Sequence, residues 1–394
     1  MENSRRISLV SAHFPPNVVG GAELNAAFLA ELLTREGWDV VMLTGAAVLP
    51  RKPPYRIISV PALRPRPSLI YEPWWARRTA QKIQRLIGHS TLVHSFDVLS
   101  RAVVAEASHP KKVTTLQDIS AVCGTINRLW VDGRICPGCN LQNLRHHCLT
   151  VQGKKGVARW ARIARYWSAT VRPYRKNLLD SYQAITTVSE FIKTFVGVPR
   201  AVVVPDLLHP LKPTCKLPHT TAPTILVVGR LAFDKGTDLI LKALAELPEF
   251  LLEFVGRGDQ ARWQNLTHAL KIADRVTFHE AIAHAEIGSW YQRADVVVLP
   301  SRAPEASSRS LLEAMSCGRA VVAPNYAGPK ELIIDGSTGR LFDRGDPHDL
   351  ARVIRQAYRE RVSLGKRALA VSLKYHPDKV LPQYLELYRE LLQA

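Results

Sequence analysis

Short apolar runs alternate with longer amphipathic stretches along most of the chain. The apolar run 7–11 precedes a Pro- and Gly-containing loop and a segment, 22–36, with helical apolar spacing. The first half continues with strands predicted over 38–43, 57–60, 91–96, 112–116, 184–188 and 201–204, and a helix over 74–87. Strands that alternate with helices predict a parallel, doubly wound α/β sheet.

A second and more regular alternating unit begins at residue 224. The pattern predicts strands over 225–228, 251–255, 276–279, 295–299 and 320–323, with helices over 237–247, 259–273, 284–293, 308–317, 328–335 and 347–361. A last amphipathic helix is expected over 378–392. The architecture that this pattern supports is two facing Rossmann-like domains with parallel sheets.

The expected domain limits follow from breaks in this pattern. An N-terminal domain takes residues 1–205 and contains an insert, at about 120–180, in which strand signals disappear. Residues 206–223 hold four prolines and no clear period, which is typical of a linker. A C-terminal domain takes residues 224–375, and 376–394 form a C-terminal helix that could return to the N-terminal domain.

Composition narrows the class of protein. The 394 residues are 46% hydrophobic and 22% charged, which excludes disordered and collagen-like chains. The apolar runs are far shorter than the roughly 20 residues that a membrane-spanning helix needs. The apolar stretch after Arg6 is also too short for a secretory signal, so we expect a cytoplasmic protein, peripheral on the cytoplasmic face of the membrane for the reasons given below.

Two cations follow the first strand of the second unit. Arg230 comes directly after that strand and its Gly229, and Lys235 comes directly before the next helix. Helix N-termini at the carboxyl ends of parallel strands attract anions, so both cations could meet a diphosphate there. Arg offers a planar fork of donors and Lys a point charge. The alternative is a pair of exposed cations near a turn.

Two carboxylates follow a later strand of the same unit. Glu305 and Glu313 are eight positions apart, and on a continuous helix they would lie about 80° from each other. Ser307, Ser308 and the amides of the following helix offer donors to an anion. Because carboxylates repel phosphate, this combination favours a ligand with hydroxyls as well as phosphates, such as a sugar nucleotide.

With these motifs in place, the sequence closely resembles the retaining glycosyltransferases of family 4 (GT4), which have the GT-B fold. The motifs that match are residues 20–23, 228–231 with 234–236, 254–258 and the block 300–339. The resemblance implies an N-terminal domain that binds the acceptor and a C-terminal domain that binds the nucleotide sugar. It implies transfer of a hexose from a nucleoside diphosphate to a hydroxyl of a glycan or lipid-linked oligosaccharide, in surface polysaccharide assembly.

The resemblance also assigns roles to residues. Arg230 and Lys235 would bind the donor diphosphate and stabilise it as it leaves, Glu305 would lie near the donor sugar, and Glu313 would bind the ribose. Gly20, Gly21, Gly229, Ser307 and Ser308 complete the expected donor site. Catalysis would be retaining, would need no metal or other cofactor, and would depend on positioning and leaving-group electrostatics.

The sequence departs from that family at two places. Gln117 and Asp118 stand where many relatives have a histidine-aspartate pair; Gln117 can hydrogen-bond a sugar hydroxyl but carries no proton at neutral pH. The glycine-phenylalanine-glycine that is common after the first glutamate is replaced by residues 306–308. Both changes bear on the identity of the sugar. They also leave open an alternative, a catalytically degenerate protein that binds a membrane or a polyanion.

Four cysteines lie close together in the insert: Cys123, Cys136, Cys139 and Cys148. In a cytoplasmic chain such clusters are more often metal ligands than disulfides, and this spacing is compatible with a structural zinc site. Iron–sulfur ligation, reduced thiols and disulfides are the alternatives.

The positive charge is concentrated in the N-terminal half. Residues 1–200 contain 28 Lys and Arg against 12 Asp and Glu, whereas residues 201–394 contain 25 against 22. No acidic residue occurs from 133 to 179, where cations alternate with Trp and Tyr, and residues 71–85 form a second basic aromatic segment. This composition predicts docking on an anionic membrane surface. Nucleic acid is the competing partner, but no recognition motif for it accompanies the charges.

Overall fold

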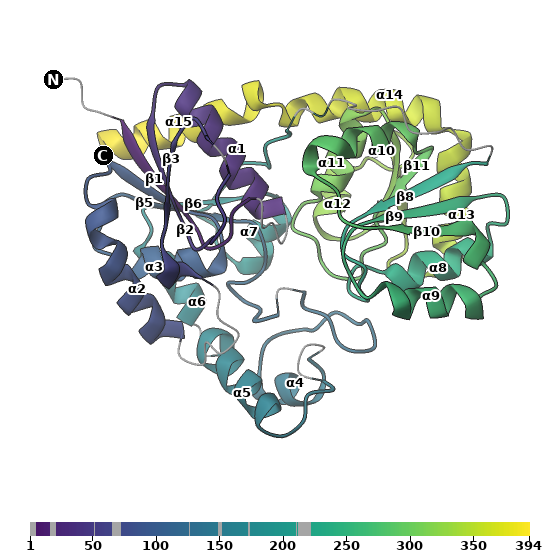
Figure 1. The fold of residues 1–394 in the computed structure, drawn as a ribbon, viewed down its shortest axis with the longest axis horizontal. Coiled ribbons are helices and arrows are strands. Elements are labelled where there is room, and N and C mark those ends of the chain that lie inside the picture. Colours follow the sequence, from purple (N-terminus) through teal and green to yellow (C-terminus); the bar gives the residue numbers. More distant parts are fainter. Residues whose placement is uncertain are drawn as a thin grey trace. The chain divides into compact units, whose positions relative to one another are not determined.

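The computed structural model describes residues 5–15, 21–50, 52–64, 72–125, 127–148, 152–171, 174–209, 211 and 222–394. The chain divides into two compact units (Figure 1). The first contains residues up to Leu207 together with Pro377–Ala394, and the second contains Leu208–His376. The chain therefore leaves the first unit once and returns to it at its end.

The first unit is built on a seven-stranded parallel sheet. The strands are β1 (Arg6–Ser11), β2 (Asp39–Thr44), β3 (Arg56–Ser59), β4 (Leu92–Ser95), β5 (Lys112–Leu116), β6 (Ala184–Thr187) and β7 (Val202–Val203), in the order β3-β2-β1-β4-β5-β6-β7. The helices between them are α1 (Gly21–Arg35), η1 (Pro61–Leu63), α2 (Glu72–Ile87), α3 (Val98–Glu106) and α7 (Glu190–Val196).

The C-terminal helix α15 (Pro377–Gln393) completes the core of this unit. Val380, Tyr384 and Tyr388 on its apolar face are buried against residues of α1 and the first strands. The hydroxyl of Tyr388 lies 2.6 Å from Nδ1 of His94, a buried residue of β4, and Nε2 of His94 lies 2.7 Å from the hydroxyl of Thr115 on β5. Helix α15 is thus hydrogen-bonded to the centre of the sheet.

The insert between β5 and β6 consists of short helices joined by irregular segments. It contains α4 (Leu141–His146), α5 (Gly156–Tyr166), a π-helical turn η2 (Trp167–Val171), α6 (Tyr174–Asn177) and η3 (Leu178–Ser181). Helices α4 and α5 extend away from the sheet of the first unit (Figure 1). The buried ion pair of Arg175 with Glu72, 2.6 Å long, connects α6 to α2.

The second unit has a six-stranded parallel sheet in the order β10-β9-β8-β11-β12-β13. Its strands are β8 (Thr224–Val228), β9 (Leu251–Val255), β10 (Val276–His279), β11 (Val296–Val298), β12 (Ala320–Pro324) and β13 (Arg340–Phe342). The helices are α8 (Thr237–Ala245), α9 (Gln260–Ala269), η4 (Ala273–Arg275), η5 (His284–Glu286), α10 (Ile287–Arg293), α11 (Arg309–Ser316), α12 (Ala327–Leu332), α13 (Pro347–Arg359), α14 (Arg361–Ser372) and η6 (Leu373–Tyr375).

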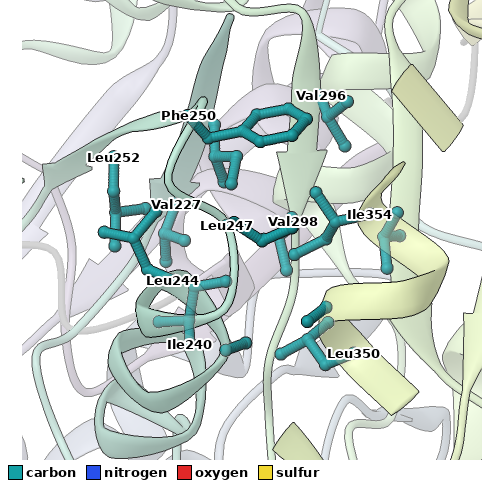
Figure 2. Packing of buried hydrophobic residues seen from close by; sticks show 14 of the residues in the cluster. Val227, Ile240, Leu244, Leu247, Phe250, Leu252, Val296, Val298, Leu350 and Ile354 are labelled. Atoms are coloured by element: carbon teal, nitrogen blue, oxygen red, sulfur yellow. The ribbon is translucent and has the colours of Figure 1, made fainter. Parts of the chain in front are cut away.

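Both faces of this second sheet are buried. Alternate residues of a strand point to opposite faces, so Val227 joins one apolar cluster and Leu226 joins another. In the first cluster, strand residues such as Val227 and Val298 pack against Ile240 of α8 and Ile354 of α13 (Figure 2). Because both faces are covered, strands such as β8 and β11 consist almost entirely of apolar residues, which is the pattern from which they were predicted.

Several expected elements differ from the structure. The helix expected over 259–273 ends at Ala269, and Lys271, two residues later, has a φ of 56°, which no α-helix contains. The segment expected as one helix over 284–293 begins as the 3₁₀ turn η5. Helices α3, α7 and α14 and strand β13 were not anticipated. Of the expected linker, only residues 206–209, 211, 222 and 223 lie within the described part of the chain.

Part of the expected basic aromatic surface is buried. In the second basic segment Glu72 and Trp75 belong to the interior, and in the insert Tyr166 and Arg175 are also buried. Each segment also has an exposed aromatic residue, since Trp74 of α2 is 58% exposed and Trp160 of α5 is 57% exposed. Among the helices that the structure describes, none combines the length and the apolar character needed to cross a membrane.

Candidate donor site

The candidate site of the second unit lies where its strand order changes direction. Strand β8 has β9 on one side and β11 on the other, so the connections that leave β8 and β11 diverge at their carboxyl ends. Such a switch point opens a crevice between the two following loops. The first loop carries Arg230 and Lys235, and the second carries Glu305. The sheet topology therefore brings together residues that are up to 75 positions apart.

The loop after β8 requires glycine at its end. Gly236 has a φ of 72°, and a Cβ on it would lie 1.9 Å from the carbonyl oxygen of Pro300. The two loops are also joined by hydrogen bonds, since the backbone amides of Arg302 and Ala303 donate to the carbonyl of Asp234 at 3.0 and 3.1 Å. This close approach fixes the position of Lys235 relative to the loop that follows β11.

Lys235 and Glu305 are directly paired across these loops. Nζ of Lys235 lies 2.6 Å from Oε1 of Glu305, and the Ser301 hydroxyl donates to the same oxygen at 2.6 Å. Both side chains retain access to solvent, with 29% of Lys235 and 15% of Glu305 exposed. An incoming anion can therefore reach Lys235, while Glu305 remains held by Ser301.

Arg230 is the more accessible cation of the site. Its guanidinium donates to the carboxylate of Asp234 at 2.9 Å and is 52% exposed. A surface ion pair of this kind contributes little stability, about 0–1 kcal/mol. Arg230 can therefore exchange Asp234 for a phosphate at small energetic cost.

Glu313 is buried in a hydrogen-bonded cluster of its own. Its Oε1 lies 2.7 Å from Nε2 of His284, and its Oε2 accepts a hydrogen bond of 3.0 Å from the hydroxyl of Tyr291. Burial, and next the charge of Glu313, raises the pKa of Tyr291 well above its usual range, so this phenol stays protonated and donates. His284 is 27% exposed and forms the solvent-facing side of the cluster.

Glu305 and Glu313 therefore do not lie on one continuous helix. Glu305 lies in the loop before α11, and only Glu313 is helical. Ser308 is the N-cap of α11, and its hydroxyl accepts from the amide of Leu311 at 3.4 Å. Ser307 precedes it, half-buried. The 80° separation expected for a single helix does not apply.

The remaining predicted site residues belong to the first unit. Gly20 lies outside the described residues, and Gly21 is the first residue of α1. Gln117 follows the end of β5, and its Nε2 is buried without a hydrogen-bond partner in the described part of the chain. Asp118 accepts from the amide of Ser120 at 2.7 Å and interacts electrostatically with two buried arginines, Arg101 and Arg175.

Two residues of the candidate donor site were not predicted from the sequence. His284 and Tyr291 are seven positions apart, which is two helical turns, and both bind Glu313. The helical spacing of His284 and Tyr291 can be read from the sequence. Nothing in the sequence connects these two residues to Glu313, which lies 22 positions after Tyr291. The connection depends on the packing of α10 beside α11, which only the tertiary structure supplies.

The four cysteines of the insert line one small cavity. None of the five cysteines in the described residues forms a disulfide. Among the described residues, no three His, Cys, Asp or Glu side chains are arranged so that they could hold one metal ion. The thiols are thus gathered but not arranged as a metal centre.

Comparison with known proteins identifies the second unit. Residues 216–370 match the family model described as Glycosyl transferases group 1. This part of the chain is a group 1 glycosyltransferase domain. The chain is 31% identical to D-inositol 3-phosphate glycosyltransferase of Xylanimonas cellulosilytica over 178 residues, which are 43% of this chain and 42% of that protein. The match thus spans less than half the length of that relative.

Solved structures agree with the expected fold. Sucrose-phosphate synthase from Thermosynechococcus elongatus superimposes with a TM-score of 0.77 at 22% identity, over 99% of both chains. Anabaena HepE, solved in complex with UDP-glucose, gives a TM-score of 0.72 at 18% identity, over 98% of this chain and 99% of that one. The prediction of a GT-B fold with two parallel α/β sheets is confirmed.

Proposed function

We propose that the protein is a retaining glycosyltransferase of family 4 that moves a hexose from a nucleoside-diphosphate sugar to a hydroxyl of a glycan or lipid-linked oligosaccharide. The observation that carries the proposal is the convergence of Arg230, Lys235 and Glu305 at the switch point of the second sheet. The group 1 domain and the UDP-glucose bound to the structural relative HepE support a nucleotide-sugar donor. Assembly of surface polysaccharide is the process that we infer.

The proposed reaction follows from the charges of the site. The bond between the anomeric carbon and the diphosphate breaks, a bond from the acceptor oxygen to that carbon forms on the same face, and the acceptor proton passes to the departing diphosphate. Arg230 and Lys235 replace their carboxylate partners with the diphosphate and stabilise the charge that develops on it. Glu305, held by Ser301, accepts hydrogen bonds from sugar hydroxyls. Glu313 accepts hydrogen bonds from the ribose.

The donor half of the proposal is tested by nucleotide release. The protein is incubated with UDP-, GDP-, ADP- or dTDP-sugars and a membrane extract as the source of acceptor, and the released nucleoside diphosphate is measured. One donor should be consumed, and Arg230→Ala or Lys235→Ala should slow release at least about 100-fold, the loss typical of a removed electrostatic stabiliser. Arg352→Ala is the matched control, because Arg352 also forms an exposed ion pair within a short sequence interval, on α13.

The outcomes separate the two functions considered for the chain. Release that depends on Arg230 and Lys235 but not on Arg352 supports the transferase and identifies its nucleotide. Absence of both binding and release with every donor contradicts it and favours a degenerate protein that binds a membrane or polyanion.

We further propose that the acceptor is reached at an anionic membrane surface through the insert. A basic pocket, lined by Arg145, Lys154, Lys155, Gly156, Arg159 and Trp160, opens at the start of α5 with a volume of about 320 Å³. The guanidinium of Arg145 lies 5.3 Å from the centre of the Trp160 ring. Each cation near an anionic leaflet contributes about 1 kcal/mol, and an exposed Trp is suited to the lipid interface.

Vesicle flotation tests the proposed binding of the insert to an anionic membrane surface. The protein should float with anionic vesicles and not with neutral ones, and Lys154→Gln, Lys155→Gln and Arg159→Gln combined should abolish flotation. The charge-matched control replaces Lys330, Lys366 and Lys374, exposed cations of the second unit, by Gln. Equal binding to neutral and anionic vesicles would contradict the proposal.

A further inference from the structure

The four clustered cysteines come from separate parts of the insert. Cys123 follows the loop after β5, Cys136 and Cys139 precede α4, and Cys148 follows it. Although up to 25 positions separate them, all four line the same cavity of about 30 Å³. That volume accommodates a water molecule or a single ion and is too small for an organic ligand.

The thiols are mutually close and buried from solvent to different degrees. Cys123 is 7% exposed, and the other three are half-buried. All four side chains line the same cavity, so their sulfurs lie near one another.

Three of the thiols donate weak hydrogen bonds. Cys136 donates to the carbonyl of Gly138 at 3.2 Å. The hydroxyls of Thr125 and Thr170 already donate elsewhere, to Asn127 and to the carbonyl of Tyr166, so Cys123 and Cys139 must be the donors toward them. Hydrogen bonds from sulfur are weak, so little opposes their replacement.

The outer part of the insert has a small apolar cluster of its own. It consists of Leu144, Ile163 and Tyr166, with Cys148 packed against them. A cluster of this size contributes little stability by itself, and small units usually depend on a disulfide or a metal. The cysteines adjoin this cluster and therefore occupy the position at which a cross-link would stabilise the insert most.

We propose that Cys123, Cys136, Cys139 and Cys148 bind one zinc ion that cross-links the insert. Four thiolates suit the tetrahedral coordination of structural zinc. Binding requires that the cysteine side chains rotate about χ1 to other staggered positions and bring the sulfurs together around the ion. On binding, each thiol loses its proton to solvent and forms one bond to the metal, which leaves a site of formal charge −2. Arg128 lines the cavity and places a positive charge beside the site, and no acidic residue occurs from 133 to 179.

The test is metal analysis of the full-length, untagged protein purified under reducing conditions. We expect about one zinc per chain, as a site with four protein ligands requires. After removal of zinc by a chelator, titration with Co²⁺ should produce the absorption bands of tetrahedral thiolate coordination and release protons. Added Zn²⁺ should then displace the cobalt and abolish the bands.

Variants assign the site to these residues. Cys139→Ser should lose most of the bound zinc and the cobalt bands, whereas Cys317→Ser, which removes a half-buried thiol of the second unit, should retain both. If Cys139→Ser does not fold, the cobalt titration of the unmodified chain still decides the matter. Zinc below about a tenth of an equivalent together with absent cobalt bands would overturn the proposal. A disulfide in the purified protein, or iron with sulfide-dependent absorption, would overturn it as well.

Discussion

The Glu313 carboxylate is buried, yet both of its oxygens are hydrogen-bonded, one to His284 and one to Tyr291. We predict that Glu313→Gln weakens binding of the donor nucleotide about 10- to 100-fold, because hydrogen bonds to a charged group contribute about 1.5–3 kcal/mol. Calorimetric titration with the nucleoside diphosphate measures the change. Glu286→Gln is the control, since Glu286 is exposed on the neighbouring turn η5. Unchanged affinity in Glu313→Gln would show that the carboxylate does not contact the ribose.

A second prediction at this scale concerns His94, whose pKa burial lowers from 6.5 to about 3. Between these values the unfolded chain binds a proton that the folded chain excludes. The free energy of unfolding is therefore undiminished above pH 6.5 and falls below it, by up to about 1.4 kcal/mol per pH unit. His94→Gln should flatten this pH dependence in urea unfolding of the first unit between pH 6 and 4. His89→Gln, which removes an exposed histidine, should leave it unchanged, and equal slopes in all three proteins would refute the assignment.

At the scale of elements, the loops after β8 and β11 depend on their contact at Gly236. We predict that Gly236→Ala lowers both stability and nucleotide release sharply, because its Cβ would meet the Pro300 carbonyl at 1.9 Å. Gly37→Ala is the matched control: Gly37 has a similar φ of 81° and open space around it, so only the backbone strain of about 1–2 kcal/mol remains. If the two variants lose equal stability and both keep activity, the contact between the loops is not needed.

The elements of the second unit were predicted well where burial is strongest. Strands β8 and β11 coincide closely with their predicted apolar runs because both faces of the sheet are covered there, whereas β10, which contains Thr277 and His279, is only partly buried. Strand β13 has three residues, too short to give a periodic signal. Helices α3 and α7 were missed although each begins at a capping residue, Asp97 and Ser189, because each is short and follows a strand closely.

Within the site, local motifs indicated the cations and carboxylates but not their partners. The pairing of Lys235 with Glu305 spans 70 positions and depends on the neighbouring places of β8 and β11 in the sheet. The helix predicted over 308–317 leaves Glu305 outside it, in agreement with α11, which begins at Arg309 after the N-cap Ser308. Sequence patterns report local periodicity, whereas these contacts arise from the order of the strands.

At the scale of the whole molecule, the chain crosses between its two units twice, because α15 belongs to the first unit and follows directly on the second. The N-terminal unit is therefore incomplete until the last residues of the chain are present. Tyr384 and Tyr388 are fully buried in its core, and His94 is hydrogen-bonded to Tyr388. The two units cannot be separated by a single cut in the chain without opening the first core.

We predict that a chain ending at His376 keeps a folded second unit but loses the stable first one. Removal of α15 exposes the apolar residues that it covers and leaves His94 without its Tyr388 partner, and large buried side chains contribute about 1.5–3 kcal/mol each. Limited proteolysis with mass spectrometry should show rapid cleavage before residue 207 and protection of 224–372. Tyr388→Phe removes only the hydroxyl and should give a much smaller effect. Equal protection of both units in the shortened chain would mean that α15 is dispensable for the first core.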